Sequence, residues 1–162
     1  MGTHIHKSHN VTLLMFHIVC TVKYRKSIIA PEMEEFIKGA CLEISERHEV
    51  VFLEIGSDIN HIHFLIQGVP KYSATHYAKI IKGNLAKQLF LQFPHIKKQL
   101  WGGEFWTDGF YANTVSQYGG EKTIQRYIQN QGKQNNKTNN HNSTSEYKKL
   151  YENKQADLFE EM

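Results

Sequence analysis

The sequence predicts an α+β sandwich of the ferredoxin-like type, in which helices cover one face of a four-stranded antiparallel sheet. Two observations carry this prediction. The expected elements follow the order strand, helix, strand, strand, helix, strand between residues 12 and 115. The chain has 162 residues, of which 40% are hydrophobic, and this is enough for one domain with a core. The second face of such a sheet stays available, and we expect it to receive a further helix.

The first half of the chain supplies a strand, a helix and a hairpin. β-Branched and other apolar residues predict a buried strand at 12–22. Pro31 suits the first turn of a helix. Apolar residues then recur at helical spacing and form one face: Met33, Phe36, Ile37, Ala40, Cys41 and Ile44. Two apolar runs, at 50–55 and 61–67, predict a hairpin with a polar turn at 56–60.

The second half supplies a helix, a strand and a last helix. Ser73 is the expected N-cap of a helix whose apolar residues recur at helical spacing up to Pro94. A fourth strand is predicted at 110–115. A last helix is expected from Glu121 to Gln131, because Gly132 is suited to end it.

We expect one domain over residues 10–132 and a flexible polar tail over 133–162. No apolar side chain occurs in 133–145, so this stretch has nothing with which to build a core. A short helix is expected within 146–160. The start of the chain, including His4-Ile5-His6, is expected to be disordered.

Composition sets broad limits on function. Nineteen Lys and Arg against sixteen Asp and Glu give a formal charge of +3, which mildly favours a polyanionic partner. Cys20 and Cys41 are too few for a disulfide framework, which favours a reducing compartment. No run approaches the roughly 20 apolar residues of a membrane span, and the first ten residues lack the apolar region of a signal peptide. These features predict a cytoplasmic protein without membrane contact.

Four residues form a candidate metal and nucleophile site. Side chains alternate along a strand, so His61 and His63 are expected on one face of the sheet. Tyr127 and Gln131 are four residues apart on the last helix and share a face. Two imidazoles and an amide oxygen suit a divalent metal with open positions. The plainer alternatives are two solvent-facing histidines, a tyrosine at the edge of the core and a surface amide.

The order and surroundings of these residues resemble the HUH-type single-tyrosine transposases of the smallest bacterial and archaeal insertion sequences. The resemblance covers about residues 10–132. The matching segments are 16–19 with 23–25, 58–66, Lys82-Gly83, the aromatic segment 100–115, and 126–131. There are two departures. Cys20 stands where the family often has tryptophan, and Ser116-Gln117-Tyr118 replaces the usual glycine after Thr-Val.

The resemblance implies a reaction and its residues. Tyr127 would attack a phosphodiester of single-stranded DNA and leave a 5′-phosphotyrosine link and a free 3′-hydroxyl. His61, His63 and Gln131 would hold the Mg²⁺ or Mn²⁺ that polarises the phosphate. Rejoining by a 3′-hydroxyl would make the reaction a transesterification. The family acts as a homodimer and recognises hairpins near the ends of the element.

DNA contacts are expected from basic and aromatic side chains near the first strand and on the second helix, which suit phosphate and base contacts. The candidates are Lys23, Tyr24, Arg25, Lys26, Lys79, Lys82 and Lys87. Three alternative functions stay open: a repeat-associated tyrosine transposase that acts on genomic palindromes, a non-catalytic nucleic-acid-binding module, and a metal hydrolase with a water nucleophile.

Overall fold

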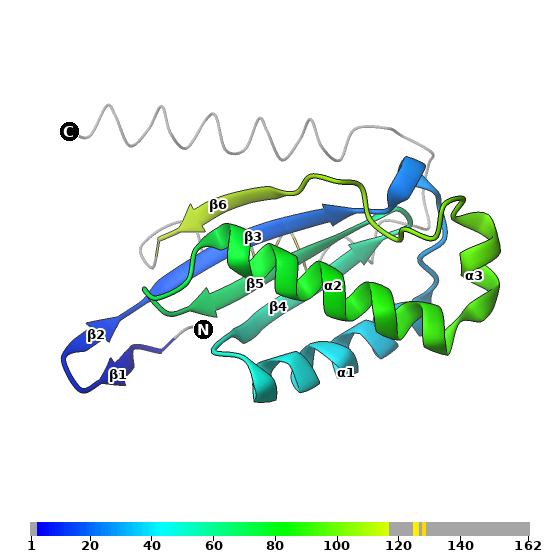
Figure 1. Ribbon diagram of the computed structural model, residues 1–162. Helices are drawn as coiled ribbons and strands as arrows, with labels where there is room; N and C mark the ends of the chain where they lie inside the picture. The colour runs from blue at the N-terminus through cyan, green and yellow to red at the C-terminus, as the bar shows by residue number, and fades with distance from the viewer. Residues whose placement is uncertain (1–2, 117–124, 127, 129–162) are drawn as a thin grey trace, which may run out of the picture.

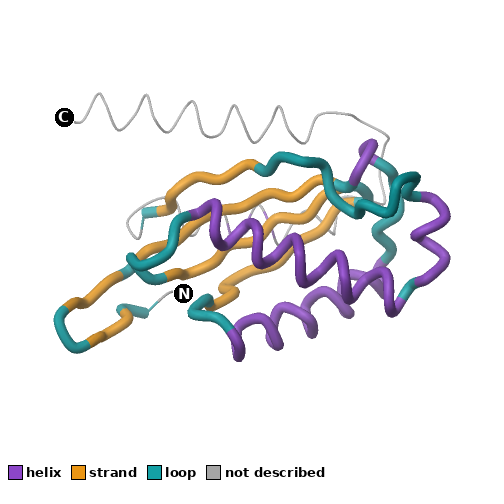
Figure 2. Tube along the Cα trace, viewed as in Figure 1, coloured by secondary structure: helices purple, strands orange, loops and turns teal. Residues whose placement is uncertain are grey.

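The computed structural model describes residues 3–116, 125, 126 and 128. Four strands form one antiparallel sheet in the spatial order β4-β5-β3-β6. Their bounds are Leu14–Thr21 for β3, Val51–Asp58 for β4, His61–Gly68 for β5 and Tyr111–Val115 for β6. Helices α1 (Pro31–Arg47) and α2 (Ala74–Gln92) lie side by side on one face of this sheet (Figure 1 and Figure 2). This arrangement confirms the predicted ferredoxin-like fold.

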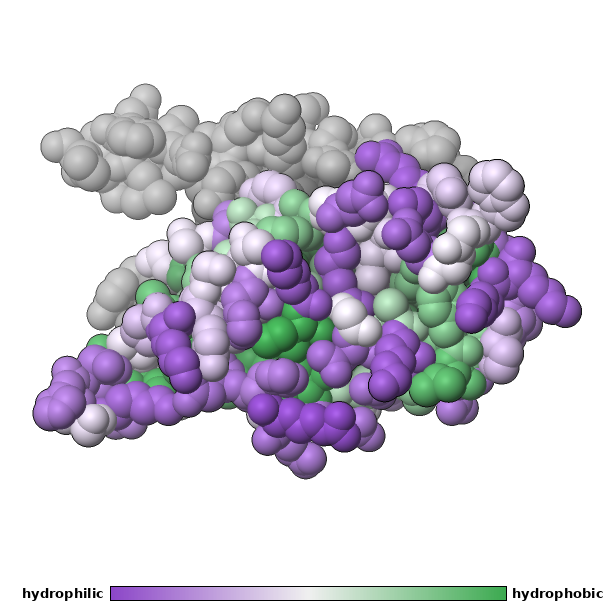
Figure 3. Space-filling model, viewed as in Figure 1, coloured by the Kyte–Doolittle hydropathy of each residue, from purple (hydrophilic) through white to green (hydrophobic). Residues whose placement is uncertain are grey.

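The main core lies between the sheet and the two helices. Ile62 and Phe64 of β5 are fully buried there, because alternate side chains of a strand point to the same face. They belong to one cluster with Ile18 of β3, Ile37 of α1 and Ile81 of α2. On the outside of the helices, hydrophilic residues cover most of the surface in view, and hydrophobic ones appear only in small areas between them (Figure 3). No helix of the described residues is long and apolar enough to cross a membrane.

The predicted helix signals are confirmed. α1 begins at Pro31, and the expected apolar face is buried except for Phe36, which is half-buried. Ser73 caps α2, since its Oγ accepts a hydrogen bond from the His76 backbone N–H at 3.1 Å. Residues 125, 126 and 128 are helical. The rest of the expected helix over 121–131 and the tail over 133–162 lie outside the described residues.

The predicted turn at 56–60 is too long. β4 continues to Asp58, because Gly56, Ser57 and Asp58 pair with residues 63, 62 and 61 of β5. Only Ile59 and Asn60 form the turn. The polar character of residues 56–58 suggested a loop, but the pairing partner determines the extent of a strand as much as local composition does.

The expectation of a disordered N-terminus is wrong for the described residues. β1 (Ile5–Lys7) and β2 (Asn10–Thr12) form a hairpin. Two long-range contacts attach it to the domain. Gln67 Nε2 donates to the Thr3 carbonyl oxygen at 2.6 Å, and Lys7 Nζ lies 2.9 Å from a carboxylate oxygen of Glu49. A reading of local composition misses such contacts.

Two short helical segments were not predicted. α3 (Pro94–Gln99) begins at the proline that was expected to end the preceding helix, because proline fits the first turn of a helix as well as it ends one. The 3-10 segment η1 (Lys23–Arg25) follows β3. Tyr24 and Arg25 within it have φ values of 58° and 51°, a left-handed conformation that is uncommon outside glycine.

The hydroxyl of Tyr77 joins α2 to the ends of two other elements. Tyr77 Oη accepts from the Val69 backbone N–H at 2.8 Å and donates to the Glu49 carbonyl oxygen at 3.0 Å. Its ring lies so close to Gly68 that a Cβ at this position would collide with the ring. Glycine is therefore required where β5 ends.

We predict that Tyr77→Phe lowers the free energy of unfolding by about 1–3 kcal/mol, because it removes one partner from each of two backbone groups near the core. Urea denaturation measures this change. The control is Tyr24→Phe, whose hydroxyl is exposed and lies 3.5 Å from its acceptor, and we expect a change below about 0.5 kcal/mol. Equal stability of Tyr77→Phe and wild type would contradict the assignment.

Candidate active site

His61 and His63 lie on the face of the sheet opposite the helices. Across the β3–β5 pairing, Thr21 stands opposite His61 and Val19 opposite His63. The intervening Ile62 is buried on the helix face. The two imidazole centroids are 4.9 Å apart, with the ring planes at 72°. The predicted placement of both histidines on one face is confirmed.

A third histidine, His17 of β3, joins this pair and was not predicted as a site residue. It is fully buried, and its Nε2 lies 3.0 Å from Nδ1 of His63. The two rings are nearly parallel, with an interplanar angle of 6°. The sequence signal was a polar residue inside an otherwise apolar strand, two positions before Val19 and hence on the histidine face.

A chain of hydrogen bonds determines which nitrogen of His63 carries the proton. The Asn113 amide N–H donates to the Thr114 carbonyl oxygen at 3.0 Å, and Asn113 also makes a side-chain hydrogen bond with His17. Because Nε2 of His17 faces His63, we infer that the Nδ1–H group of His17 donates this bond to the Asn113 amide oxygen. Nε2 of His17 then accepts from Nδ1 of His63, so the lone pair of His63 is on Nε2.

A separate hydrogen bond, to Asn60, gives His61 the same tautomer as His63. The Nδ1 atom of His61 lies 2.7 Å from the side-chain oxygen of Asn60. Because an amide oxygen only accepts, Nδ1 of His61 carries the proton and its Nε2 carries the lone pair. Both histidines thus present Nε2 as the atom that can bind a metal, and a polar partner holds each ring.

Burial keeps all three rings neutral near physiological pH. Desolvation lowers the pKa of His17 to about 4, and the bond to Asn113 offsets this only in part. Desolvation also lowers the pKa of His63 well below its usual value. The pKa of His61 is lowered by burial and, to a smaller extent, by Arg25, while Asp58 raises it. Neutral imidazole is the form that binds metal ions.

Ile128 packs on this face of the sheet beside the histidines. Ile128 is buried in a small cluster with Met15, Leu65 and Val115. A Cβ at Gly56 would collide with the side chain and the carbonyl oxygen of Ile128. Gly56 is the β4 partner of His63. Ile128 therefore packs on the open face of the sheet next to the histidine pair.

Two of the four predicted site residues, Tyr127 and Gln131, lie outside the described residues. Within the described part of the chain, no group of three or more His, Cys, Asp or Glu side chains is placed to hold a metal. His61 and His63 supply two neutral nitrogen donors, which fit a divalent ion whose other ligands come from elsewhere. The donor set is therefore compatible with the expected metal but incomplete in this part of the chain.

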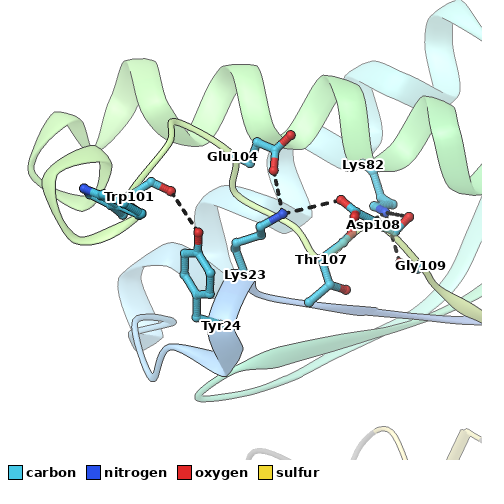
Figure 4. Close-up of polar contacts among 8 residues, drawn as sticks. All are labelled: Lys23, Tyr24, Lys82, Trp101, Glu104, Thr107, Asp108 and Gly109. Carbon is cyan, nitrogen blue, oxygen red and sulfur yellow. Dashed lines mark hydrogen bonds and ion pairs between the residues drawn. The ribbon is translucent and has the colours of Figure 1, made fainter.

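Two of the expected DNA-binding lysines contact protein groups instead (Figure 4). Lys23 Nζ lies 2.6 Å from a carboxylate oxygen of Glu104 and 3.4 Å from one of Asp108. Lys82 Nζ donates to the carbonyl oxygens of Thr107, Asp108 and Gly109 at 2.7, 3.1 and 3.0 Å. Both lysines hold the segment that precedes β6.

The other candidates for DNA contact are exposed but fall in two places. The first group follows β3, at the end of the strands where His61 begins β5, and consists of Tyr24, Arg25 and Lys26. Lys79 and Lys87 lie on α2, which covers the face opposite the histidines. The structure thus brings only the first group to the neighbourhood of the histidine pair.

We predict that neutral His61 and His63 both carry their proton on Nδ1. Long-range ¹H–¹⁵N spectra of the metal-free protein above neutral pH measure this directly. His17→Phe removes the acceptor of the His63 proton, so the His63 signals are expected to move toward a mixture of tautomers. His61 is an internal control, because Asn60 still holds it. A proton on Nε2 of wild-type His63 would contradict the assigned chain of hydrogen bonds.

The comparisons with known proteins agree with this fold. The family model described as "Transposase IS200 like" matches residues 10–131. The ISDra2 transposase TnpA of Deinococcus radiodurans is 31% identical over 120 residues, which are 73% of this chain and 84% of that relative. The transposase for insertion sequence element IS200 of Salmonella typhimurium is 31% identical over 133 residues, with 81% of this chain and 85% of the relative covered.

Solved structures show the same fold. A putative transposase from Deinococcus radiodurans superimposes with a TM-score of 0.64 at 27% identity, over 78% of this chain and 97% of that one. A REP-associated tyrosine transposase bound to a REP hairpin gives a TM-score of 0.54 over 78% of this chain and 70% of that one. Its identity of 9% supports the fold alone. Since the family model spans most of the sequence, the chain belongs to the IS200-like transposase family.

Proposed function

We propose that this transposase cleaves and rejoins single-stranded DNA at the ends of an insertion sequence, with Tyr127 as nucleophile and a divalent metal as cofactor. One observation carries the proposal. His61 and His63 lie together on the open face with pKa values lowered by burial, and Ile128, the residue bonded to Tyr127, packs against Gly56 beside them. Support for the nucleophile itself comes from the sequence spacing and the family.

The proposed metal ligands are His61, His63 and Gln131. A Mg²⁺ or Mn²⁺ ion held there would polarise the scissile phosphate and stabilise the negative charge that develops on it. The ordinary pKa of a tyrosine phenol, near 10, makes it a poor nucleophile at neutral pH unless a positive charge lies close by. A divalent ion held by the histidine pair would supply this positive charge to a tyrosine beside it.

The proposed reaction is balanced without an external energy source. The Tyr127 oxygen forms a bond to phosphorus, and the bond from phosphorus to the 3′-oxygen breaks. The phenol proton is lost and the 3′-oxygen gains a proton. Because one phosphodiester replaces another, a second 3′-hydroxyl can reverse the reaction and join a different strand.

The proposed partners are single-stranded DNA with hairpins and a second copy of the chain. The solved REP-associated transposase is bound to a hairpin, which supports a hairpin ligand for a protein of this fold. The formal charge of +3 is compatible with a polyanion. The homodimer is proposed from the family resemblance.

We predict a denaturation-resistant adduct when the protein meets labelled single-stranded DNA from the flanks of its own gene with Mn²⁺ or Mg²⁺. Tyr127→Phe is expected to form none, because it lacks the attacking oxygen. His63→Ala is expected to reduce adduct formation more than about a hundredfold, since a bound metal ion contributes several kcal/mol to the transition state. Denaturing gel electrophoresis measures the adduct.

Tyr72→Phe, on the segment before α2, is the matched control and is expected to form the adduct normally. Cleavage that persists in Tyr127→Phe would favour a water nucleophile and reject the tyrosine mechanism. Binding without cleavage of any flank would favour a non-catalytic binding module.

A further inference from the structure

Trp101 is an unusually exposed aromatic residue in a well-defined turn. Its relative exposure is 82%, whereas the preceding Leu100 is fully buried. The turn is closed by a hydrogen bond from the Gly103 backbone N–H to the Leu100 carbonyl oxygen at 3.1 Å. Gly102 and Gly103 have φ values of 88° and 74°, which glycine adopts readily. The fold therefore holds the indole ring in solvent, where it contributes little to the core.

Tyr24 lies beside this tryptophan and is also exposed, at 56%. Its hydroxyl points to the Trp101 carbonyl oxygen at 3.5 Å (Figure 4). Tyr24 and Arg25 both have positive φ, a conformation that persists in non-glycine residues only when the surroundings enforce it. Backbone hydrogen bonds do so here. Before Tyr24, the Val22 N–H donates to the Asn60 carbonyl oxygen and the Lys23 N–H to that of Phe105, at 2.9 and 2.8 Å, and after Arg25 the Ile29 N–H donates to the Ile59 carbonyl oxygen at 3.0 Å.

Two lysines hold the segment that follows Trp101, one from η1 and one from α2. Lys23 joins Glu104 and Asp108, and Lys82 binds three consecutive carbonyl oxygens that follow Trp106 (Figure 4). The Trp106 indole N–H in turn donates to the Lys82 carbonyl oxygen at 2.9 Å. These contacts fix the backbone next to the two aromatic rings, and the rings themselves face solvent.

The two rings lie at the histidine end of the sheet. The Val22 hydrogen bond ends at Asn60, the residue that orients His61, and the charge of Arg25 acts on His61. Arg25 and Lys26 are exposed next to Tyr24, and Lys97 and Lys98 form the last turn of α3 before Trp101. The nearby carboxylates of Glu104 and Asp108 are paired with Lys23, so the exposed basic residues adjacent in sequence to the two rings stay available, and exposed aromatic rings with such neighbours suit the bases and phosphates of an unpaired strand.

We propose that Tyr24 and Trp101 form a stacking site for an unpaired nucleobase of the DNA strand whose phosphate lies at the histidine pair. This inference rests on the proposed function, because it takes single-stranded DNA as the ligand. The cationic neighbours favour DNA over a second protein chain as the occupant. Stacking needs only a π face, so the site holds a base near the cleavage position without selecting its identity.

The test uses the Tyr127→Phe protein without metal, so that binding is measured apart from chemistry. The probe is a fluorescent oligothymidylate, titrated by anisotropy, together with an abasic oligomer of the same length. Trp101→Ala is expected to weaken binding of oligothymidylate about 5- to 150-fold, the range for loss of one stacked base. Its affinity for the abasic oligomer is expected to equal that of the unsubstituted protein, since both keep the same phosphate contacts.

Two further variants separate stacking from other roles. Trp101→Phe keeps an aromatic face and is expected to retain most of the affinity. Leu42→Ala removes another exposed apolar side chain, 67% exposed on α1, and is expected to bind like the unsubstituted protein. The salt dependence of binding gives a second readout. Trp101→Ala should leave the slope of log affinity against log salt unchanged, whereas Arg25→Ala should make the slope shallower by the contribution of about one phosphate contact.

Each outcome decides between explanations. Unchanged affinity of Trp101→Ala, or an equal loss on the abasic oligomer, overturns the stacking site while the proposed function stands. A change in oligomeric state with unchanged DNA binding identifies a second copy as the occupant and also overturns it. If the unsubstituted protein binds no single-stranded DNA, both the stacking site and the proposed function are rejected. Stacking behaviour in a protein that forms no adduct supports the site and rejects only the proposed chemistry.

Discussion

The two-residue alternation of β5 is the constraint on which the rest of the structure depends. Ile62 and Phe64 form the centre of the core on one face, and His61 and His63 lie on the other. A slip of one residue in its pairing would place the imidazoles against the helices and the apolar side chains on the open face. The burial of Ile62 and Phe64 in the core therefore also fixes the pairing register that places His61 and His63 on the open face. Pairing with β3 on one side and β4 on the other enforces that register.

The open face is built by apolar contacts and buried polar groups together. A buried histidine is costly unless its ring nitrogens are bonded. His17 and His63 bond each other through one ring nitrogen each, and Asn113 bonds His17. The same bonds that make burial tolerable also choose the tautomer. Gly56, the β4 partner of His63, leaves room for Ile128, which therefore packs close to these buried polar groups.

Sequence patterns predicted what depends on periodicity, and missed what depends on tertiary partners. The helix over Pro31–Arg47, the Ser73 cap and the common face of His61 and His63 follow from local spacing. The polar end of β4 and the N-terminal hairpin depend on pairing and on contacts from distant residues, so composition suggested loops. The sequence suggested Lys82 as a phosphate ligand, because its three carbonyl acceptors lie more than twenty residues away and local patterns do not show them. Tyr127 and Gln131 stay predictions.

The central claim is that Nε2 of His61 and Nε2 of His63 together bind the catalytic metal. Pulsed electron paramagnetic resonance of the Mn²⁺-loaded full-length protein tests it directly, because nitrogen couplings reveal imidazole ligands. We expect two coupled imidazoles in the wild type and one in His61→Ala or His63→Ala, each first shown to unfold cooperatively. Bound Mn²⁺ without nitrogen coupling, or couplings that survive both substitutions, would contradict the account.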